Sequence, residues 1–348
     1  MYDYIYAKRV KKPGIHLAHV MHNITMSDHL SFAVTLASST LKDAYTHALV
    51  FEEPFGDIPE HTVNILMSKG LHLERVDCIT PATLADAGYC GAILYNIVDR
   101  PNLGSALPTM YYSCGVYDAL TRPALTVAPS FYASKHNCRG EVYIDEPDCI
   151  IPPFIDTRRS RNLKTEDHTF TVTLLHDNYM DSYPCELLIH LLGNLPGDVG
   201  LLLNCYTKYK HPGVILALSK RNHRFRDNLR TVATIPETTL GYLLASDVLV
   251  YGSAPRYYEP FGRNVMEALA LGKAVVCDNK GACSEYLEHG VNCLIYETFD
   301  DVLEYISLLK HEPNKRELLG KNAQLTAARY DVNVHAGDFR YALKRVGI

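Results

Sequence analysis

Apolar and polar positions are organised in alternating blocks along this chain. Short, continuously apolar runs are followed by longer segments in which apolar residues recur every three or four positions. The first pattern is typical of strands buried on both faces, and the second of amphipathic helices. In the first half the expected strands are 14–20, 48–51, 71–76, 92–97, 109–113, 124–128 and 142–144, and the expected helices are 28–41, 59–69 and 81–87. Strands that alternate with helices predict parallel sheets with helical crossovers.

The same pattern restarts after a break. Pro152-Pro153 ends the first block, and the polar, basic segment 157–164 follows it. In the second half the expected strands are 169–175, 200–204, 214–219 and 231–234, and the expected helices are 187–192, 300–310 and 315–328. We therefore predict two doubly wound, Rossmann-like α/β domains, 1–156 and 157–329, and a C-terminal helix at 330–348 that can pack back on the first domain. In such sheets ligands collect at the carboxyl ends of the strands.

Length and composition agree with this plan. The 348 residues are too many for one typical core, and 47% apolar with 21% charged residues is the composition of a soluble globular protein. No apolar stretch approaches the ~18–20 residues of a membrane span, and the first residues do not read as a signal peptide. Ten cysteines stand without metal-site spacing, which favours reduced thiols and a cytoplasmic protein.

The candidate chemistry lies in segment 258–276. Glu259 and Glu267 stand eight residues apart, with a Pro-Phe-Gly turn after the first, a helical stretch around the second and Gly272 as a stop. If the helix begins near Gly262, its first backbone N–H groups form an anion site between the two carboxylates. Such a site suits a ligand with both phosphates and hydroxyls, and a nucleotide-sugar is one.

With its flanks, 240–253 and 280–295, this segment resembles the retaining, group-1 (family-four-like) glycosyltransferases of GT-B fold over roughly sixty contiguous residues. The resemblance implies a metal-independent enzyme with no tightly bound cofactor and an NDP-sugar as donor substrate. It also implies that Glu259 and the amides of Phe261 and Gly262 hold the donor sugar, while Glu267 binds the ribose.

Three departures from the family pattern change the expected site. Segment 21–28 replaces the usual Gly-Gly loop, Ser113 stands where a His is frequent, and 176–183 lacks the usual diphosphate-binding Arg and Lys. A leaving diphosphate needs donors or cations in a water-poor cleft. The replacement cation is expected to be Arg263 first, with Arg256 and Lys208 behind it. Asn264, at the same helix start, completes the predicted donor-binding set.

Three histidines in and just after the first predicted strand, His16, His19 and His22, invite a metal-site interpretation. Side chains on a strand alternate between faces, so His19 points away from the other two, and we predict no metal. His19, His22, Asn23 and Ser113 are instead candidates for contact with the acceptor or the sugar.

The expected function is sugar transfer from a nucleotide-sugar to an acceptor hydroxyl, with a glycan or small-molecule acceptor favoured. Basic runs at 8–12, 158–161 and 220–230 keep a nucleic-acid partner open, although the net charge is −5. The alternatives are a transferase for a hydroxymethylated DNA base, for example viral, a non-catalytic nucleotide-sugar-binding pseudoenzyme, a sugar-nucleotide epimerase, and a purely structural or interaction protein. A base acceptor requires flipping into the cleft. The sugar, the nucleotide, the acceptor and the oligomeric state are not determined by the sequence.

Overall fold

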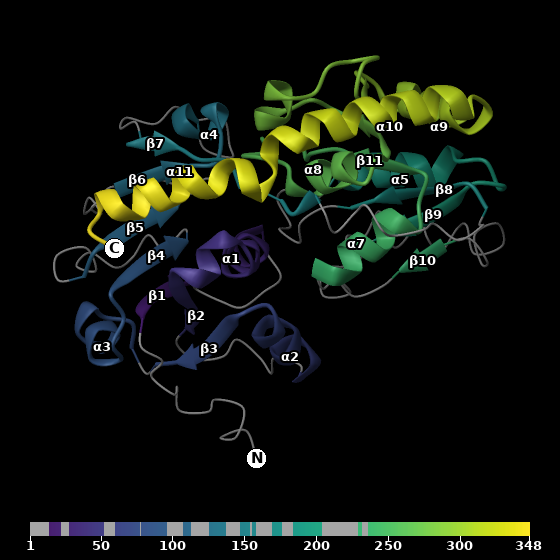
Figure 1. Cartoon of the computed structure of the whole chain (residues 1–348). Coiled ribbons are helices and arrows are strands. Elements are labelled where there is room, and N and C mark those ends of the chain that lie inside the picture. The colour runs from purple at the N-terminus through teal and green to yellow at the C-terminus, as the bar shows by residue number, and fades with distance from the viewer. Residues whose placement is uncertain are drawn as a thin grey trace. The chain divides into compact units, whose positions relative to one another are not determined.

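The chain divides into two compact units, Met1–Ile155 with Tyr330–Ile348, and Asp156–Arg329 (Figure 1). The computed structural model describes residues 14–21, 28–51, 60–76, 78–95, 107–112, 125–136, 147–153, 155–157, 169–175, 184–203, 229–231 and 236–348. Each unit is built on its own parallel sheet, so the predicted fold class, two doubly wound α/β domains, is confirmed.

The first unit holds a seven-stranded sheet of order β3-β2-β1-β4-β5-β6-β7. Its strands are β1 Ile15–Val20, β2 Tyr45–Phe51, β3 Leu71–Arg75, β4 Gly91–Tyr95, β5 Thr109–Tyr112, β6 Leu125–Ala128 and β7 Cys149–Ile150. Its helices are α1 Asp28–Ser38, η1 Thr40–Asp43, α2 Glu60–Ser68, α3 Pro81–Asp86, α4 Phe131–Lys135 and α11 Val332–Arg345. One face of the sheet packs against α1, α2 and α11, and the other packs against α3.

The C-terminal helix α11 completes the core of the first unit. Phe339 on α11 is fully buried, and its ring lies 5.7 Å from that of Phe32 on α1. The backbone at the start of α11 is also tied down, because Val332 N–H donates to the Ile155 carbonyl at 2.9 Å. A segment far along the chain therefore covers a sheet built from the first 155 residues.

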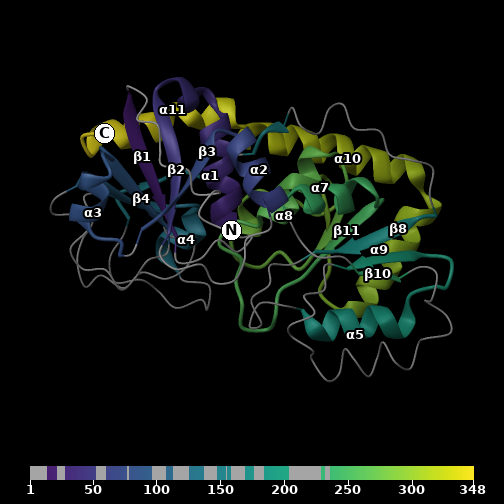
Figure 2. The same ribbon diagram turned by 90° about the horizontal axis from the view of Figure 1, so that it is seen from below.

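The second unit holds a six-stranded sheet of order β10-β9-β8-β11-β12-β13. Its strands are β8 Thr171–Leu174, β9 Gly200–Leu203, β10 Leu229–Thr231, β11 Val248–Tyr251, β12 Ala274–Cys277 and β13 Leu294–Ile295. Its helices are α5 Cys185–Asn194, α7 Pro236–Leu244, α8 Arg263–Ala270, η4 Gly281–Glu285, α9 Phe299–His311, α10 Pro313–Ala327 and, at the boundary, η5 Ala328–Tyr330. Figure 2 shows α5 on one face of this sheet and α7 and α8 on the other. The strand order reverses at β8, so the topology places a ligand at the carboxyl ends of β8 and β11.

Most predicted elements are found within a few residues of their expected bounds. The expected helix 28–41 is divided into α1 and η1, because the Ser39 side chain accepts the Leu41 N–H and stops the α-helix. The short helix α4 was not predicted; its start is capped by Ser130, which accepts the Ala133 N–H at 2.9 Å. The expected strands 142–144 and 214–219 lie outside the described residues. None of the described helices is long and apolar enough to cross a membrane.

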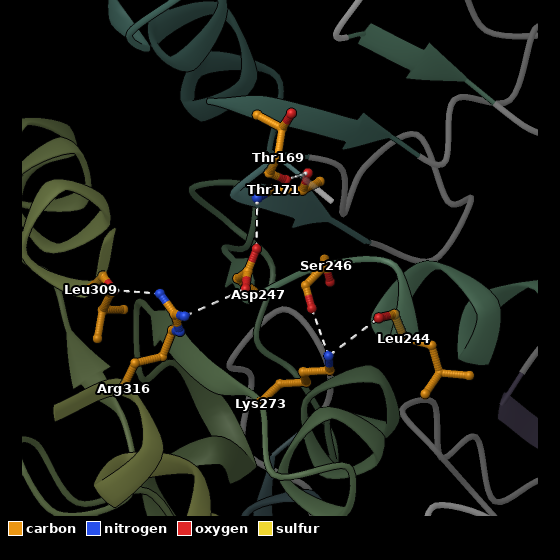
Figure 3. Close-up of polar contacts among 8 residues, drawn as sticks. All are labelled: Thr169, Thr171, Leu244, Ser246, Asp247, Lys273, Leu309 and Arg316. Carbon is orange, nitrogen blue, oxygen red and sulfur yellow. Dashed lines mark hydrogen bonds and ion pairs between the residues drawn. The ribbon is translucent and has the colours of Figure 1, made fainter. Parts of the chain in front are cut away.

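A polar network pins the amino ends of the central strands of the second unit (Figure 3). Asp247 accepts the Thr171 N–H at 2.8 Å with its side chain and donates its own N–H to the Thr171 carbonyl at 2.7 Å. Arg316 of α10 lies 3.7 Å from the other Asp247 oxygen and donates to the Leu309 carbonyl at 2.8 Å. Lys273 donates to the carbonyl of Ser246 at 2.7 Å. These charges lie at the strand ends opposite the expected ligand, so we assign them a structural role.

Candidate functional site

The candidate site is built around the amino end of α8, which follows the loop after β11. Gly262 is the N-cap of α8 and has φ +81°, a left-handed conformation that a residue with a Cβ adopts only at a cost. A Cβ at this position would lie 2.6 Å from the Tyr286 hydroxyl and 2.8 Å from Cys283 Sγ. The helix ends as predicted at Gly272: Gly272 N–H donates to Leu269, and Lys273 N–H donates to Ala268. Both ends of α8 are thus set by glycines.

Glu259 is held against this helix start. Its side chain is buried at 2% exposure, and its Oε1 accepts the N–H of Gly262 at 3.0 Å and that of Phe261 at 3.5 Å. Its Oε2 accepts a short hydrogen bond from the hydroxyl of Tyr251, the last residue of β11. The carboxylate therefore caps the turn that leads into α8. The two amides predicted to face the donor sugar are directed at Glu259 in this structure.

The segment after β12 packs directly against Glu259. Ala282 N–H donates to the Glu259 carbonyl at 2.7 Å. Gly281 has φ +68°, and a Cβ on it would lie 2.3 Å from the same carbonyl oxygen, so only glycine fits. At the end of this segment, Tyr286 donates its hydroxyl to the Phe261 carbonyl at 2.5 Å. The two loops that follow β11 and β12 thus form one packed unit around Glu259.

The loops are also joined by a buried carboxylate. Asp278, the first residue after β12, accepts the Ser253 N–H at 2.7 Å. Burial raises the pKa of Asp278, and its hydrogen bond to Ser253 opposes that shift. This contact fixes the carboxyl ends of β11 and β12 relative to each other.

Arg263 and Glu267 form an ion pair along α8. Arg263 Nε donates to Glu267 Oε1 at 2.9 Å, and the two side chains are 7% and 22% exposed. The spacing of four residues places both on one face of the helix. The guanidinium therefore extends toward Glu267, and the two residues predicted to bind diphosphate and ribose are neighbours.

The structure distributes the other predicted residues unevenly. Asn264 lies in the first turn of α8 and is half-buried, whereas Arg256 lies exposed in the loop before the motif. Four further candidates, Lys208, His22, Asn23 and Ser113, lie outside the described residues.

His19 is an interior residue of the first unit, contrary to the expectation that its ring contacts an acceptor or sugar. Its side chain is fully buried; Nδ1 lies 2.8 Å from the Tyr95 hydroxyl, and Nε2 lies 2.9 Å from His47 Nδ1. Burial lowers the pKa of His19 well below its usual value, and His47 adds to this effect. Burial likewise lowers the pKa of His47 to about 4. The alternation of β1 places His19 on the face that meets α1 and α11, where a neutral ring is stable.

Sequence reasoning missed the residues that hold Glu259. Tyr251 ends an apolar stretch and reads there as an ordinary core aromatic, whereas Tyr286 stands in the polar segment 284–289. The one sequence signal was that Tyr251 precedes the motif and Tyr286 lies in its exit segment. Their hydroxyls meet the Glu259–Gly262 turn only because β11, β12 and α8 are brought together by the sheet.

The comparisons with known proteins concern the fold and the segment that holds this site. Residues 216–326, which include the whole of the Glu259–Glu267 segment, match the family model described as glycosyl transferases group 1. This part of the chain belongs to the group-1 glycosyltransferase family. Its GT-B architecture is that of the solved structure of Anabaena HepE in complex with UDP and glucose, with a TM-score of 0.69, 16% identity and coverage of 94% of this chain and 99% of that one.

Two curated proteins resemble parts of this chain. The N,N'-diacetylbacillosaminyl-diphospho-undecaprenol alpha-1,3-N-acetylgalactosaminyltransferase of Campylobacter jejuni is 36% identical over 94 residues, 26% of this chain. Spore coat protein SA of Bacillus subtilis is 28% identical over 151 residues, 42% of this chain. The matches span only 25% and 37% of the lengths of these relatives.

Proposed function

We propose that this chain transfers a sugar from a nucleotide-sugar to an acceptor hydroxyl, with retention of the anomeric configuration. The proposal is based on two carboxylates that lie near the amino end of α8. Glu259 is hydrogen-bonded to the backbone at the helix start, and Glu267 lies on the helix surface beside Arg263. In support, the HepE structure of the same fold holds UDP and glucose.

The proposed roles follow from the position of each group. The first N–H groups of an α-helix point out of its amino end and, with the helix dipole, favour an anion there. The diphosphate of the donor is assigned to this end of α8, where these donors meet the charge that develops as the diphosphate leaves. Arg263 and Asn264 begin the helix and are assigned to the diphosphate, with Arg256 and Lys208 as secondary cations.

The hydroxyl-bearing parts of the donor are assigned to the two glutamates. Glu259 lies at the amino end of α8, beside the position assigned to the diphosphate, so its carboxylate is assigned to the hydroxyls of the sugar. Glu267 is 22% exposed, so its oxygens are accessible to the ribose. No protein nucleophile is assigned, because in this proposal the leaving phosphate itself receives the proton of the acceptor hydroxyl.

The deciding experiment is a two-stage assay on the full chain. Nucleoside diphosphates and their glucose conjugates are first compared by thermal shift, in which a ligand at a hundredfold excess over Kd adds ~2.7 kcal/mol. The donor selected is then incubated with glycan, small-molecule and hydroxymethylated-DNA acceptors, and transfer is followed by mass spectrometry. We expect binding of one nucleotide family and transfer to one acceptor class. Binding without transfer or donor hydrolysis would contradict catalysis, and absence of binding would contradict the proposal as a whole.

A further inference from the structure

Two buried tyrosines enclose the turn that precedes α8. Tyr251 reaches it from the end of β11 and is 2% exposed; Tyr286 reaches it from the end of η4 and is 8% exposed. Tyr251 bonds to the side chain of Glu259, and Tyr286 bonds to the backbone carbonyl of Phe261. One hydroxyl comes from a residue that precedes the turn in the chain and the other from a residue that follows it, and each is hydrogen-bonded to a different residue of the turn.

The hydroxyls are not needed to fill space. A buried hydroxyl costs free energy unless it is hydrogen-bonded, and a phenylalanine ring occupies almost the same volume. Burial raises the pKa of Tyr286 well above its usual range, so this hydroxyl keeps its proton and acts as a donor. Each hydroxyl is used for a directed hydrogen bond to the turn that carries Glu259.

We propose that Tyr251 and Tyr286 are positioning residues that set the Glu259 carboxylate and the Phe261–Gly262 turn for contact with the donor's sugar. Tyr251 fixes the plane of the carboxylate, because it holds one oxygen while the Gly262 N–H holds the other. Tyr286 fixes the turn itself, because its hydroxyl donates to the backbone carbonyl of Phe261. This inference rests on the proposed function, in which Glu259 contacts the sugar and Glu267 the ribose.

The proposal predicts a separation between two ligands that differ only in the sugar. A nucleoside diphosphate lacks the group that Glu259 contacts, whereas the nucleotide-sugar has it. Loss of a positioning hydroxyl must therefore weaken the sugar contact alone. A hydroxyl that only stabilises the fold would affect both ligands equally.

The test compares Tyr251→Phe and Tyr286→Phe with a matched control, Tyr242→Phe. Tyr242 is also buried, at 6% exposure on α7 of the same unit, and its hydroxyl has no hydrogen-bond partner among the described residues. Affinities for UDP and UDP-glucose are measured by calorimetry on the full chain, or for the matching pair that the nucleotide panel selects. We expect Tyr251→Phe to weaken UDP-glucose binding about tenfold, the scale of one charge-assisted hydrogen bond, while the affinity for UDP stays within about twofold. Tyr286→Phe follows the same pattern to a smaller extent, and Tyr242→Phe changes neither affinity.

Hydrogen exchange gives a second readout that does not need a ligand. In Tyr251→Phe and Tyr286→Phe we expect faster exchange of the amides of 259–263, with unchanged exchange in β8 and β9. If Tyr251→Phe does not fold, Glu259→Gln replaces it and is expected to show the same separation between UDP and UDP-glucose. The positioning role is overturned, while the proposed function stands, if Tyr251→Phe and Tyr286→Phe lose affinity for UDP and UDP-glucose equally. The same conclusion follows if both variants, like Tyr242→Phe, change neither affinity. A wild-type protein that binds no nucleotide overturns the proposed function and this inference together.

Discussion

The Arg263–Glu267 ion pair joins two residues to which the sequence assigned separate duties. The Arg263 guanidinium donates a hydrogen bond of 2.9 Å to the Glu267 carboxylate and so also orients that carboxylate. The diphosphate-binding role proposed for Arg263 and the ribose-binding role proposed for Glu267 are therefore expected to be coupled through this hydrogen bond. Two groups in direct contact generally show non-additive effects when both are removed.

Removal of Glu267 is expected to weaken nucleoside diphosphate binding by about 1.5–3 kcal/mol, because the ribose hydroxyls lose a charged acceptor. Arg263→Ala is expected to weaken nucleoside diphosphate binding more than nucleoside binding. The double variant should lose less than the sum of the two single variants, with a coupling of roughly 0.5–3 kcal/mol. Calorimetry on the four proteins measures this cycle.

The control is the Glu317–Lys321 pair on α10, which has the same spacing, a 3.9 Å separation and side chains about 70% exposed. Glu317→Ala should leave nucleotide affinity unchanged. Unaltered affinity in Glu267→Ala would contradict the ribose assignment, and equal loss of nucleoside and diphosphate in Arg263→Ala would move the cation role to Arg256 or Lys208.

At the scale of elements, the start of α8 depends on a turn that only glycine can form. Gly262 lies in the left-handed region, and Tyr286 and Cys283 occupy the space beside it. The resulting helix start places Glu259 behind it and Arg263 in its first turn. The position of the whole candidate site is thus set by one backbone conformation.

Gly262→Ala should destabilise the second unit by more than about 1–2 kcal/mol, since left-handed strain adds to the steric overlap with Tyr286. Gly193→Ala on α5 is the matched control, because a Cβ there meets nothing within 4 Å and φ is not positive. That exchange should stabilise by about 0.5–1 kcal/mol through helix propensity. Thermal denaturation distinguishes the two, and a neutral Gly262→Ala would refute the strained turn.

The network at the amino ends of β8 and β11 supports a second prediction at this scale. Asp247→Ala removes the acceptor for the Thr171 N–H and should cost about 1–3 kcal/mol, whereas Asp247→Asn keeps an oxygen there and should cost less. Hydrogen exchange of β8 and thermal denaturation measure both variants. Asp198→Ala, which removes an exposed partner of Lys310, should leave the midpoint of thermal denaturation nearly unchanged. Similar losses in Asp247→Ala and Asp198→Ala would contradict the pinning role.

At the scale of the whole molecule, each unit is stabilised by its own core, and the two cores respond to different conditions. The first unit buries the His19–His47 pair, while the second buries carboxylates and thiols around Glu259. Acidification to a mildly acidic pH should therefore act first on the unit that holds the histidines.

The pKa of His47 is lowered in the fold to about 4, against about 6.5 in an unfolded chain. Between about pH 6.5 and pH 4 the unfolded chain binds a proton at His47 more readily than the folded chain does. The contribution of neutral His47 to the free energy of unfolding is therefore fully present above about pH 6.5 and is lost as the pH falls toward 4. The loss from this group is at most roughly 3 kcal/mol. Hydrogen exchange of β1 and β2 at pH 7 and pH 5 should show the change, and His47→Gln should reduce it. His335→Gln serves as control, because His335 is half-buried on α11 beside Asp338 and outside the His19–His47 pair. An equal pH response in wild type and His47→Gln would contradict the assignment.

Much of the fold follows from local pattern. Buried parallel strands are continuously apolar and helices repeat every three to four residues, so β1, β8 and α9 were predicted within two residues of their observed bounds. The elements that were not predicted are too short to show a hydrophobic repeat. The two-residue strand β7 and the five-residue helix α4 carry no detectable repeat, and a Ser side chain rather than hydrophobic pattern starts α4.

The sequence by itself determined the fold class, the boundaries of α8 and the placement of both glutamates around its start, because glycine punctuation and spacing are local properties. Only the tertiary structure decided what these groups touch. Sequence spacing does not say that the Tyr251 hydroxyl meets Glu259, that Arg263 turns toward Glu267, or that His19 faces an interior partner. Such contacts depend on which strands become neighbours and which way each side chain leaves its strand. Both are settled only when the sheet is assembled.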